Sequence, residues 1–280
     1  MFLIYELCYL SIRGAFRHFD HLESLAIPSL DTLLIDILLF EPLLLMTTKT
    51  QMQWLGHSAF RIISPDGHII YIDPFLSQNP STPDQWKKVD EADFIFLTHG
   101  HDDHVGDTLD IATKTGCMVG GMVELMSLLE LEGLPASQSI DFNKGGSVHF
   151  DDFSVTMVHA NHSSSYKGAY AGEAAGLIFS FEDDICIYHM GDTNIFGDLE
   201  LYGELYEPDI VLAPIGDHYT MGPEEAAYAV QLIDPKLAIP IHYGTWDVIA
   251  SDPIEFKYFV EEDEEIQVII PPIGADIFNF

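Results

Sequence analysis

The sequence predicts an α+β fold in which two packed β-sheets are flanked by helices. Three features indicate this class: short strands and tight turns from Met52 onward, strands that alternate with helices as far as Leu131, and a second β-rich block that ends in further strands and helices. No low-complexity linker divides residues 47–280. We therefore expect this segment to form one domain built from two mixed β/α halves.

The first half begins as a β-meander and continues as alternating strands and helices. Apolar runs bounded by Gly, Pro, Asp and Ser indicate strands, and apolar residues three or four positions apart indicate helices. The expected strands are 53–55, 59–63, 68–72, 94–97 and 117–119, and the expected helices are 107–115 and 123–131. Ser64-Pro65-Asp66-Gly67 forms the turn between the second and third strands.

The second half has more strands and two later helices. Its expected strands are 148–150, 153–158, 177–181, 185–188, 210–214, 237–241 and 267–270. One helix is expected to begin at Gly222-Pro223-Glu224-Glu225, because proline suits the first helical position and acidic residues stabilise the first turn. A second helix is expected over 254–260.

Charge is the unusual property of the composition. The 280 residues include 45 Asp and Glu but 11 Lys and Arg, which gives a formal net charge of -34 and a pI near 4.3. Such a surface repels phosphate backbones, so nucleic acid is not an expected partner. We interpret the charge as an acidic solubility shell, with adaptation to high salt as one origin. The three scattered cysteines favour a reducing, cytoplasmic location.

The first 46 residues differ in character from the rest. Residues 25–46 are leucine-rich, but three acidic residues and two prolines interrupt them. Each acid would cost about 2.5–3.5 kcal/mol inside a membrane, so no membrane span is expected. No basic segment precedes the first apolar stretch, as a signal peptide would need. We expect residues 1–46 to be an N-terminal extension that contributes no functional residue. Met46 and Met52 are alternative translation starts.

Polar side chains recur where the expected strands end. Six apolar strands run into His or Asp, at Asp73, His99, His162, Asp192, Asp217 with His218, and His242. Strand ends are often polar, which accounts for Asp and Gly but explains His less well. The pattern favours a site at one edge of a sheet.

The stretch LTHGHDDHVGD is the most specific of these strand ends. In an extended segment, residues two apart face the same way, so His99, His101 and Asp103 can converge on one point. The chain then enters a helix, which brings His104 beside them. The pattern H-x-H-x-D-H thus offers imidazole and carboxylate ligands to two adjacent cations.

Seven motifs along the chain extend this pattern. In order they are WLGHSAF (54–60), IDPF (72–75), THGHDDHVGD (98–107), NHSS (161–164), YHMGDT (188–193), PIGDHYTMGPEEAA (214–227) and PIHYGTW (240–246). Together they resemble the metallo-β-lactamase superfamily, in particular its prokaryotic metal-dependent hydrolases related to ascorbate-6-phosphate lactonase-like and phospholipase D-like members. The resemblance covers 52–280, and implies a four-layer αββα sandwich with a metal centre at the sheet edge.

The resemblance also implies a set of seven metal ligands. His99, His101 and His162 would hold one ion, Asp103, His104 and His242 the other, and Asp192 would bridge them. His159 is the rival for the third ligand of the first ion, but the serine run after His162 matches the family better. His159 is then either an inward strand histidine or a residue that supports a metal ligand from behind.

Two divalent ions suit this ligand charge. Five neutral imidazoles and two aspartates carry -2 against +4, which leaves +2 and favours a bridging hydroxide as the nucleophile. Asp103 and Asp192 are therefore the carboxylates expected to take part in catalysis. Zinc is the expected metal, and manganese, iron and nickel also suit nitrogen and oxygen ligands. The expected substrates are small molecules: a lactone, a carboxylic ester or a phosphodiester.

Four further residues match the family motifs. Asp73 is expected to orient a metal ligand from behind. His57, His189 and His218 are expected to support a ligand, contact substrate or donate a proton, and a structural role is equally open for each. A homo-oligomer is expected only by analogy with relatives.

Three alternative functions remain. A diiron oxygen reductase would place Glu where His101 stands. A nuclease conflicts with the net charge, and no basic RNA-binding arm is present in the sequence. A non-enzymatic metal-binding module would be favoured if any ligand were missing, but all seven residues are present. Substrate specificity is expected to lie in loops 79–89 and 163–175.

Overall fold

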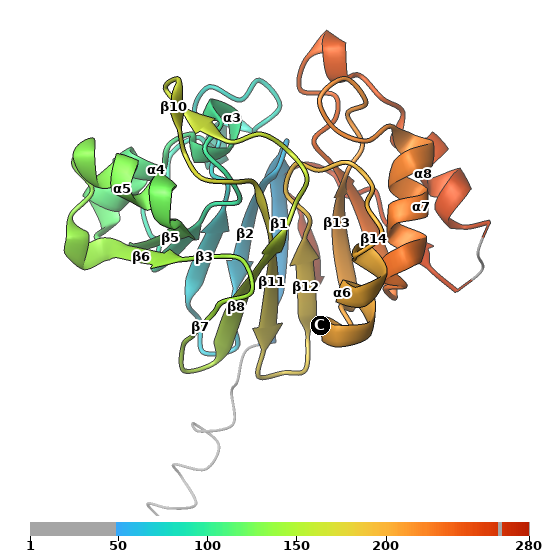
Figure 1. The fold of residues 1–280 in the computed structure, drawn as a ribbon, viewed down its shortest axis with the longest axis horizontal. Helices are drawn as coiled ribbons and strands as arrows, with labels where there is room; N and C mark the ends of the chain where they lie inside the picture. Colours follow the sequence, from blue (N-terminus) through green and yellow to red (C-terminus); the bar gives the residue numbers. More distant parts are fainter. Residues whose placement is uncertain (1–48, 263–264, 280) are drawn as a thin grey trace, which may run out of the picture. The chain divides into compact units, whose positions relative to one another are not determined.

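The computed structural model describes residues 49–262 and 265–279 (Figure 1). The expected extension over 1–46 lies outside the described residues. Within the described part of the chain, no helix has the length and apolar character that crossing a membrane requires.

Two seven-stranded sheets form the centre of the domain (Figure 1). The first sheet has the order β16-β1-β2-β3-β4-β5-β6, with strands β16 (Asp276–Asn279), β1 (Gln51–Gly56), β2 (Ala59–Ile63), β3 (Ile69–Ile72), β4 (Phe94–Phe96), β5 (Met118–Met122) and β6 (Ser139–Phe142). The second has the order β15-β14-β13-β12-β11-β8-β7, with strands β15 (Gln267–Val268), β14 (Leu237–Ile241), β13 (Ile210–Pro214), β12 (Cys186–His189), β11 (Ala175–Phe181), β8 (Phe153–His159) and β7 (Ser147–His149). A small hairpin joins β9 (Ser165–Tyr166) to β10 (Ala169–Tyr170).

Helices cover the outer face of each sheet (Figure 1). Beside the first sheet lie α4 (Thr108–Thr115) and α5 (Val123–Leu131), and beside the second lie α6 (Leu199–Tyr206), α7 (Pro223–Ile233) and α8 (Pro253–Val260). The short helix α3 (Asp102–Val105) stands at the sheet edge, and single turns form η1 (Asp84–Trp86), η2 (Ala136–Gln138) and η3 (Asp247–Ile249). The predicted four-layer αββα sandwich is confirmed.

Strand direction brings the predicted site residues to one edge. β3 and β4 are parallel, and β1 runs in the same direction because β1 and β3 both pair antiparallel with β2. In the second sheet β12, β13 and β14 are parallel, and β8 runs with them because β11 is antiparallel to both β8 and β12. The carboxyl ends of these strands therefore meet at one edge of each sheet.

Aromatic packing holds the two sheets together. Phe96 of β4 is fully buried, and its ring centroid lies 5.6 Å from that of Phe179 on β11 in the opposite sheet. Gly120 on the neighbouring strand β5 leaves space for this ring, because a Cβ there would lie 2.6 Å from two Phe96 ring carbons. The strand that leads into the predicted metal-binding motif is thus anchored in the core between the sheets.

Most predicted elements form. The helix predicted over 107–115 forms as α4, and the helical turn expected around His104 forms separately as α3. Gly106 separates them with a φ of +44°, where a Cβ would lie 2.5 Å from Phe75 Cα. The chain passes too close to this neighbour for a continuous helix. The last predicted strand is also shorter, ending at Val268.

We expect Phe96→Ala to lower the free energy of unfolding by about 3–5 kcal/mol, because it removes a buried ring and leaves a cavity between the sheets. Urea unfolding followed by tryptophan fluorescence measures this change. Leu131→Ala is the control, since Leu131 is 84% exposed and its loss should change stability by less than about 0.5 kcal/mol. Equal effects of the two substitutions would contradict this account of the core.

Candidate metal centre

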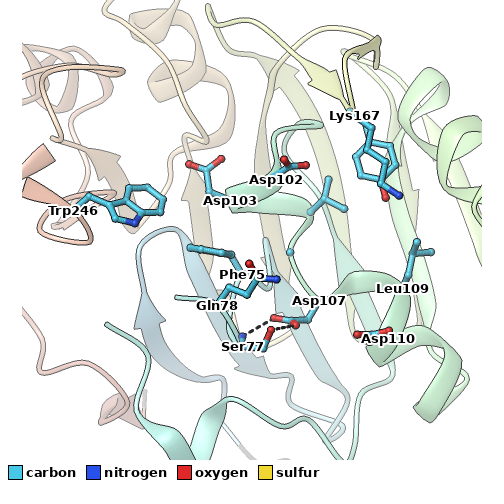
Figure 2. A pocket seen from close by; sticks show the side chains of 13 residues that line it. Phe75, Ser77, Gln78, Asp102, Asp103, Asp107, Leu109, Asp110, Lys167 and Trp246 are labelled. Carbon is cyan, nitrogen blue, oxygen red and sulfur yellow. Dashed lines mark hydrogen bonds between the residues drawn. The ribbon is translucent and has the colours of Figure 1, made fainter. Parts of the chain in front are cut away.

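Two cavities open side by side at the sheet edge. One has a volume of about 640 Å³ and is lined by His101, Asp103, His162, Asp192 and His242 together with Ser163, Tyr219, Trp246 and Val248. The other is about 610 Å³, and Figure 2 shows its wall, in which Asp103 and Trp246 are shared with the first cavity. Five of the seven predicted ligands therefore face an accessible space, whereas His99 and His104 are fully buried.

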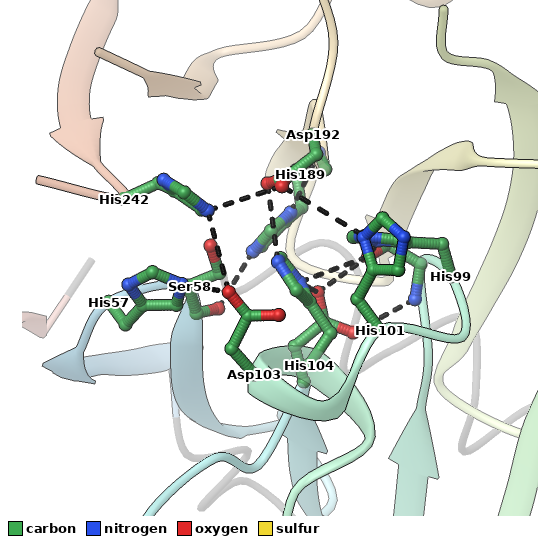
Figure 3. A network of polar contacts seen from close by, with 12 residues as sticks. His57, Ser58, His99, His101, Asp103, His104, His189, Asp192 and His242 are labelled. Carbon is green, nitrogen blue, oxygen red and sulfur yellow. Dashed lines mark hydrogen bonds and ion pairs between the residues drawn. The ribbon is translucent and has the colours of Figure 1, made fainter. Parts of the chain in front are cut away.

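The side chains beneath the first cavity form two groups (Figure 3). One group is His99, His101, His162 and Asp192, and the other is His57, Asp103, His104 and His242. In each group the potential ligand atoms all lie within 4.8 Å of one another. The structure thus brings together all seven predicted ligands, and adds His57 to them.

Asp192 lies between the two groups. Its Oδ2 is 3.9 Å from His99 Nε2, 3.5 Å from His162 Nε2 and 3.2 Å from His242 Nε2, while its Oδ1 is 3.3 Å from His104 Nε2. One carboxylate therefore faces imidazoles of both groups.

Several buried polar atoms at the centre have no hydrogen-bond partner. They are His104 Nε2, Asp192 Oδ1 and both ring nitrogens of His242. A buried polar group left unpaired costs about 1–3 kcal/mol, so such atoms need an explanation. Cations between the two groups would satisfy three of them, since His104 Nε2, Asp192 Oδ1 and His242 Nε2 point into the same small space. The residues present therefore fit a metal centre.

Asp73 sets the orientation of two of the imidazoles. Its Oδ2 accepts from His104 Nδ1 at 2.7 Å and from the Thr98 hydroxyl at 2.6 Å, and its Oδ1 accepts from Thr98 N at 2.9 Å. Since the Thr98 hydroxyl donates to Asp73, its oxygen can accept from His99 Nδ1 at 3.0 Å. These bonds direct Nε2 of both imidazoles toward the centre, where His99 Nε2 lies 2.9 Å from His101 Nδ1, so Asp73 lies behind the two rings.

His57 contributes more directly than the sequence suggested. Its Nε2 lies 3.2 Å from Asp103 Oδ2, and its Nδ1 lies 2.8 Å from Thr245 Oγ1. Burial, followed by the nearby His242, lowers the pKa of His57 to about 4. A neutral His57 can donate from Nε2 to Asp103 while Nδ1 accepts from the Thr245 hydroxyl. Sequence reasoning did not consider Thr245, although it follows His242 by three residues in the matched motif.

His189 has a structural position. Its Nδ1 accepts from Gly191 N at 3.1 Å, so its Nε2 carries the proton and donates to the Ser58 carbonyl at 2.9 Å. Both ring nitrogens are therefore occupied by backbone groups. The ring ties the loop that holds Asp192 to the turn that holds His57.

The remaining candidates lie outside both groups. His218 is exposed, and its ring packs against Tyr219 with centroids 4.6 Å apart. His159 Nδ1 lies 3.0 Å from Lys144 Nζ, and its ring packs on Phe196. Of the two rivals for the third ligand, the structure places His162 at the centre and His159 away from it.

The electrostatics of the centre favour positive charge. Burial opposes ionisation of Asp192, yet His242 and His104 hold the pKa of this carboxyl well below its usual value. Burial alone would lower the pKa of His104, but Asp192 and Asp73 outweigh it and raise that pKa well above its usual value. A divalent cation between the two groups would compete with protons for the same side chains, so metal binding should release protons.

The comparisons with known proteins agree with this geometry. Residues 51–242 match the model of the Beta-lactamase superfamily domain. A UPF0173 metal-dependent hydrolase of Koribacter versatilis is 43% identical over 215 residues, covering 75% of this chain and 91% of the relative. One from Methanosarcina mazei is 42% identical over 231 residues, covering 81% of this chain and 97% of the relative.

Solved structures show the same fold. Igni18, a metallo hydrolase from Ignicoccus hospitalis, superimposes with a TM-score of 0.74 at 35% identity, covering 83% of this chain and 100% of that one. An isothiocyanate hydrolase from Delia radicum gut bacteria has a TM-score of 0.66 at 20% identity and covers 82% of this chain and 99% of that one, which supports the fold alone. The chain belongs to the metallo-β-lactamase superfamily, as its motifs predict. Within that superfamily it is a member of the family of UPF0173 metal-dependent hydrolases.

We expect His189→Ala to lower the free energy of unfolding by about 2–4 kcal/mol, because it leaves the Ser58 carbonyl and the Gly191 N–H buried without a partner. Chemical unfolding measures the change. The exposed His218 is the matched control, and His218→Ala should change stability by less than about 0.5 kcal/mol. A result in which both substitutions are silent would contradict the structural role of His189.

Proposed function

We propose that this protein is a hydrolase that works with two divalent cations. His99, His101 and His162 would hold one cation, Asp103, His104 and His242 the other, and Asp192 both. The observation that carries this proposal is the position of Asp192, whose two oxygens face imidazoles of both groups while Oδ1 lacks a hydrogen-bond partner. Zinc is the proposed metal, and manganese, iron and nickel suit the same donors.

The ligand set leaves a centre with net positive charge. Five neutral imidazoles and two carboxylates carry -2, so two divalent ions would leave +2. Bound ions would act as Lewis acids on a substrate carbonyl or phosphoryl oxygen and lower the pKa of water from about 15.7 to about 7. The substrate classes that match this chemistry are small lactones, carboxylic esters and phosphodiesters.

The chain's own residues orient this centre. Asp73 holds His104 directly and His99 through the Thr98 hydroxyl, so neither ring needs to rotate when substrate binds. His57 performs the same task for Asp103, with its own ring fixed by Thr245. Partners of this kind often change metal affinity by about 10- to 100-fold when they are removed.

The proposal includes the cellular location and the oligomeric state of the protein. Cys117 and Cys186 are both buried free thiols in the described part of the chain, which supports a reducing, cytoplasmic location. A homo-oligomer is proposed only by analogy with relatives.

Metal analysis of the purified full chain should give about two equivalents of divalent metal for each chain. Asp192→Ala should retain less than one equivalent, because both groups lose the ligand they share. Asp102→Ala is the matched control: Asp102 is exposed beside Asp103, outside both ligand groups, and its loss should leave the metal content unchanged. Full metal content in Asp192→Ala would contradict the shared-ligand arrangement.

A panel of lactones, aryl esters and bis-aryl phosphodiesters tests the reaction class. We expect zinc-loaded protein to hydrolyse at least one of them, with the activity lost after chelation and restored by added metal. Absence of hydrolysis for all three classes in the fully loaded protein would instead support a non-enzymatic metal-binding module.

A further inference from the structure

We infer that the cleft over the centre selects neutral substrates with an apolar or aromatic group, which packs on a wall formed by Trp246, Tyr219 and Val248. This inference rests on the proposed hydrolase function and names its substrate class. It assigns Trp246 as a residue that determines specificity.

The wall consists of large apolar side chains that are left open to solvent. Trp246 is 37% exposed, Val248 47% and Tyr219 55%, and all three line the 640 Å³ cavity together with the proposed metal ligands. Ten large apolar side chains are exposed in the described part of the chain, so three of them gather over this one site. Covering such surface on ligand binding is favourable by about 25 cal/mol for each Å² of apolar area.

Trp246 is held in place before any ligand arrives. Its ring centroid lies 5.1 Å from that of His57 and 5.9 Å from that of Phe75. The Trp246 carbonyl also accepts from Ile249 N at 3.0 Å, in the loop that begins with the proposed ligand His242. A group packed on Trp246 would therefore sit at a fixed position relative to the reacting bond, and little side-chain entropy would be lost on binding.

The same cavity offers no side chain that would clamp an anion. Among the described residues that line it, none is Lys or Arg. Among the residues that line the neighbouring cavity the single basic one is Lys167, whose Nζ lies 2.6 Å from Glu132 Oε2. The carboxylates of Asp102 and Asp110 line the same cavity. An anionic substrate would meet carboxylates on its way in and would be held by the cations alone.

The charge of the centre itself works in the opposite direction. Two bound cations would leave +2, which attracts anions, whereas the carboxylates around the cleft repel them. A neutral substrate avoids this repulsion and gains the apolar contact with Trp246. The structure therefore favours a neutral ester or lactone over a phosphodiester. An experiment that varies substrate charge decides whether attraction by the cations or repulsion by the carboxylates is stronger.

The charge arm compares p-nitrophenyl hexanoate with the p-nitrophenyl monoester of adipic acid on zinc-loaded protein. Both contain the same reacting bond and a six-carbon acyl chain, but the second ends in a carboxylate. We expect kcat/KM to be about tenfold higher for the hexanoate at low ionic strength, and the ratio to shrink as salt screens the carboxylates. A ratio of one, or a preference for the anion, would overturn the inference.

The apolar arm compares p-nitrophenyl phenylacetate with p-nitrophenyl acetate. Trp246→Ala should lower the ratio of their kcat/KM values by about tenfold, since an apolar contact of this size contributes a factor of about 10 to 200. Tyr219→Ala, at a more exposed position, should lower it in the same direction. Tyr258→Ala is the control, because Tyr258 is 63% exposed on α8 and lies outside both cavities.

The outcomes separate this inference from the function on which it rests. If metal-loaded wild type hydrolyses none of the four esters, both the ester-hydrolase function and the inference are wrong. A second outcome is that wild type hydrolyses the esters while the phenylacetate-to-acetate ratio of kcat/KM is the same in wild type, Trp246→Ala and Tyr219→Ala. In that case only the role of the apolar wall in specificity is wrong. Metal content measured on each variant shows whether the centre is intact.

Discussion

The buried Asp192 carboxylate is the interaction on which the rest of the site depends. It is 2% exposed and faces His99, His104, His162 and His242, which come from three different strand ends of two sheets. A buried carboxylate is costly unless it is paired. The sandwich is therefore most stable when positive charge lies between Asp192 and these rings. Fold and site are coupled through this one group.

The backbone is strained where the strands deliver their side chains. His57, Asp73 and His242 all have positive φ values, of 55°, 44° and 56°. Such conformations cost on the order of 1–3 kcal/mol each for residues other than glycine, and they persist only where the surroundings enforce them. The His57 carbonyl accepts from His242 N at 3.0 Å and from the Trp54 indole at 2.9 Å, so two of these turns support each other. These turns place His57 against Asp103, Asp73 against His104 and His242 against Asp192.

The sequence predicted which side chains gather at the sheet edge better than it predicted their supports. His99 and His101 fall in one group, as alternation in an extended segment predicts, whereas Asp103 lies on α3 and falls with His104 in the other group. His57 could not be placed in the same way, because its position depends on a positive φ and on Thr245, which is 188 positions away. Long-range contacts of this kind cannot be read from local spacing.

The central claim is that one carboxylate holds two cations. Anomalous diffraction at the zinc absorption edge, on crystals grown with zinc, tests it directly. We expect two peaks about 3.5–4 Å apart, with the Asp192 carboxylate between them and His57 donating to Asp103 beside the second. A single peak at full zinc loading, or two peaks of which only one touches Asp192, would contradict the account.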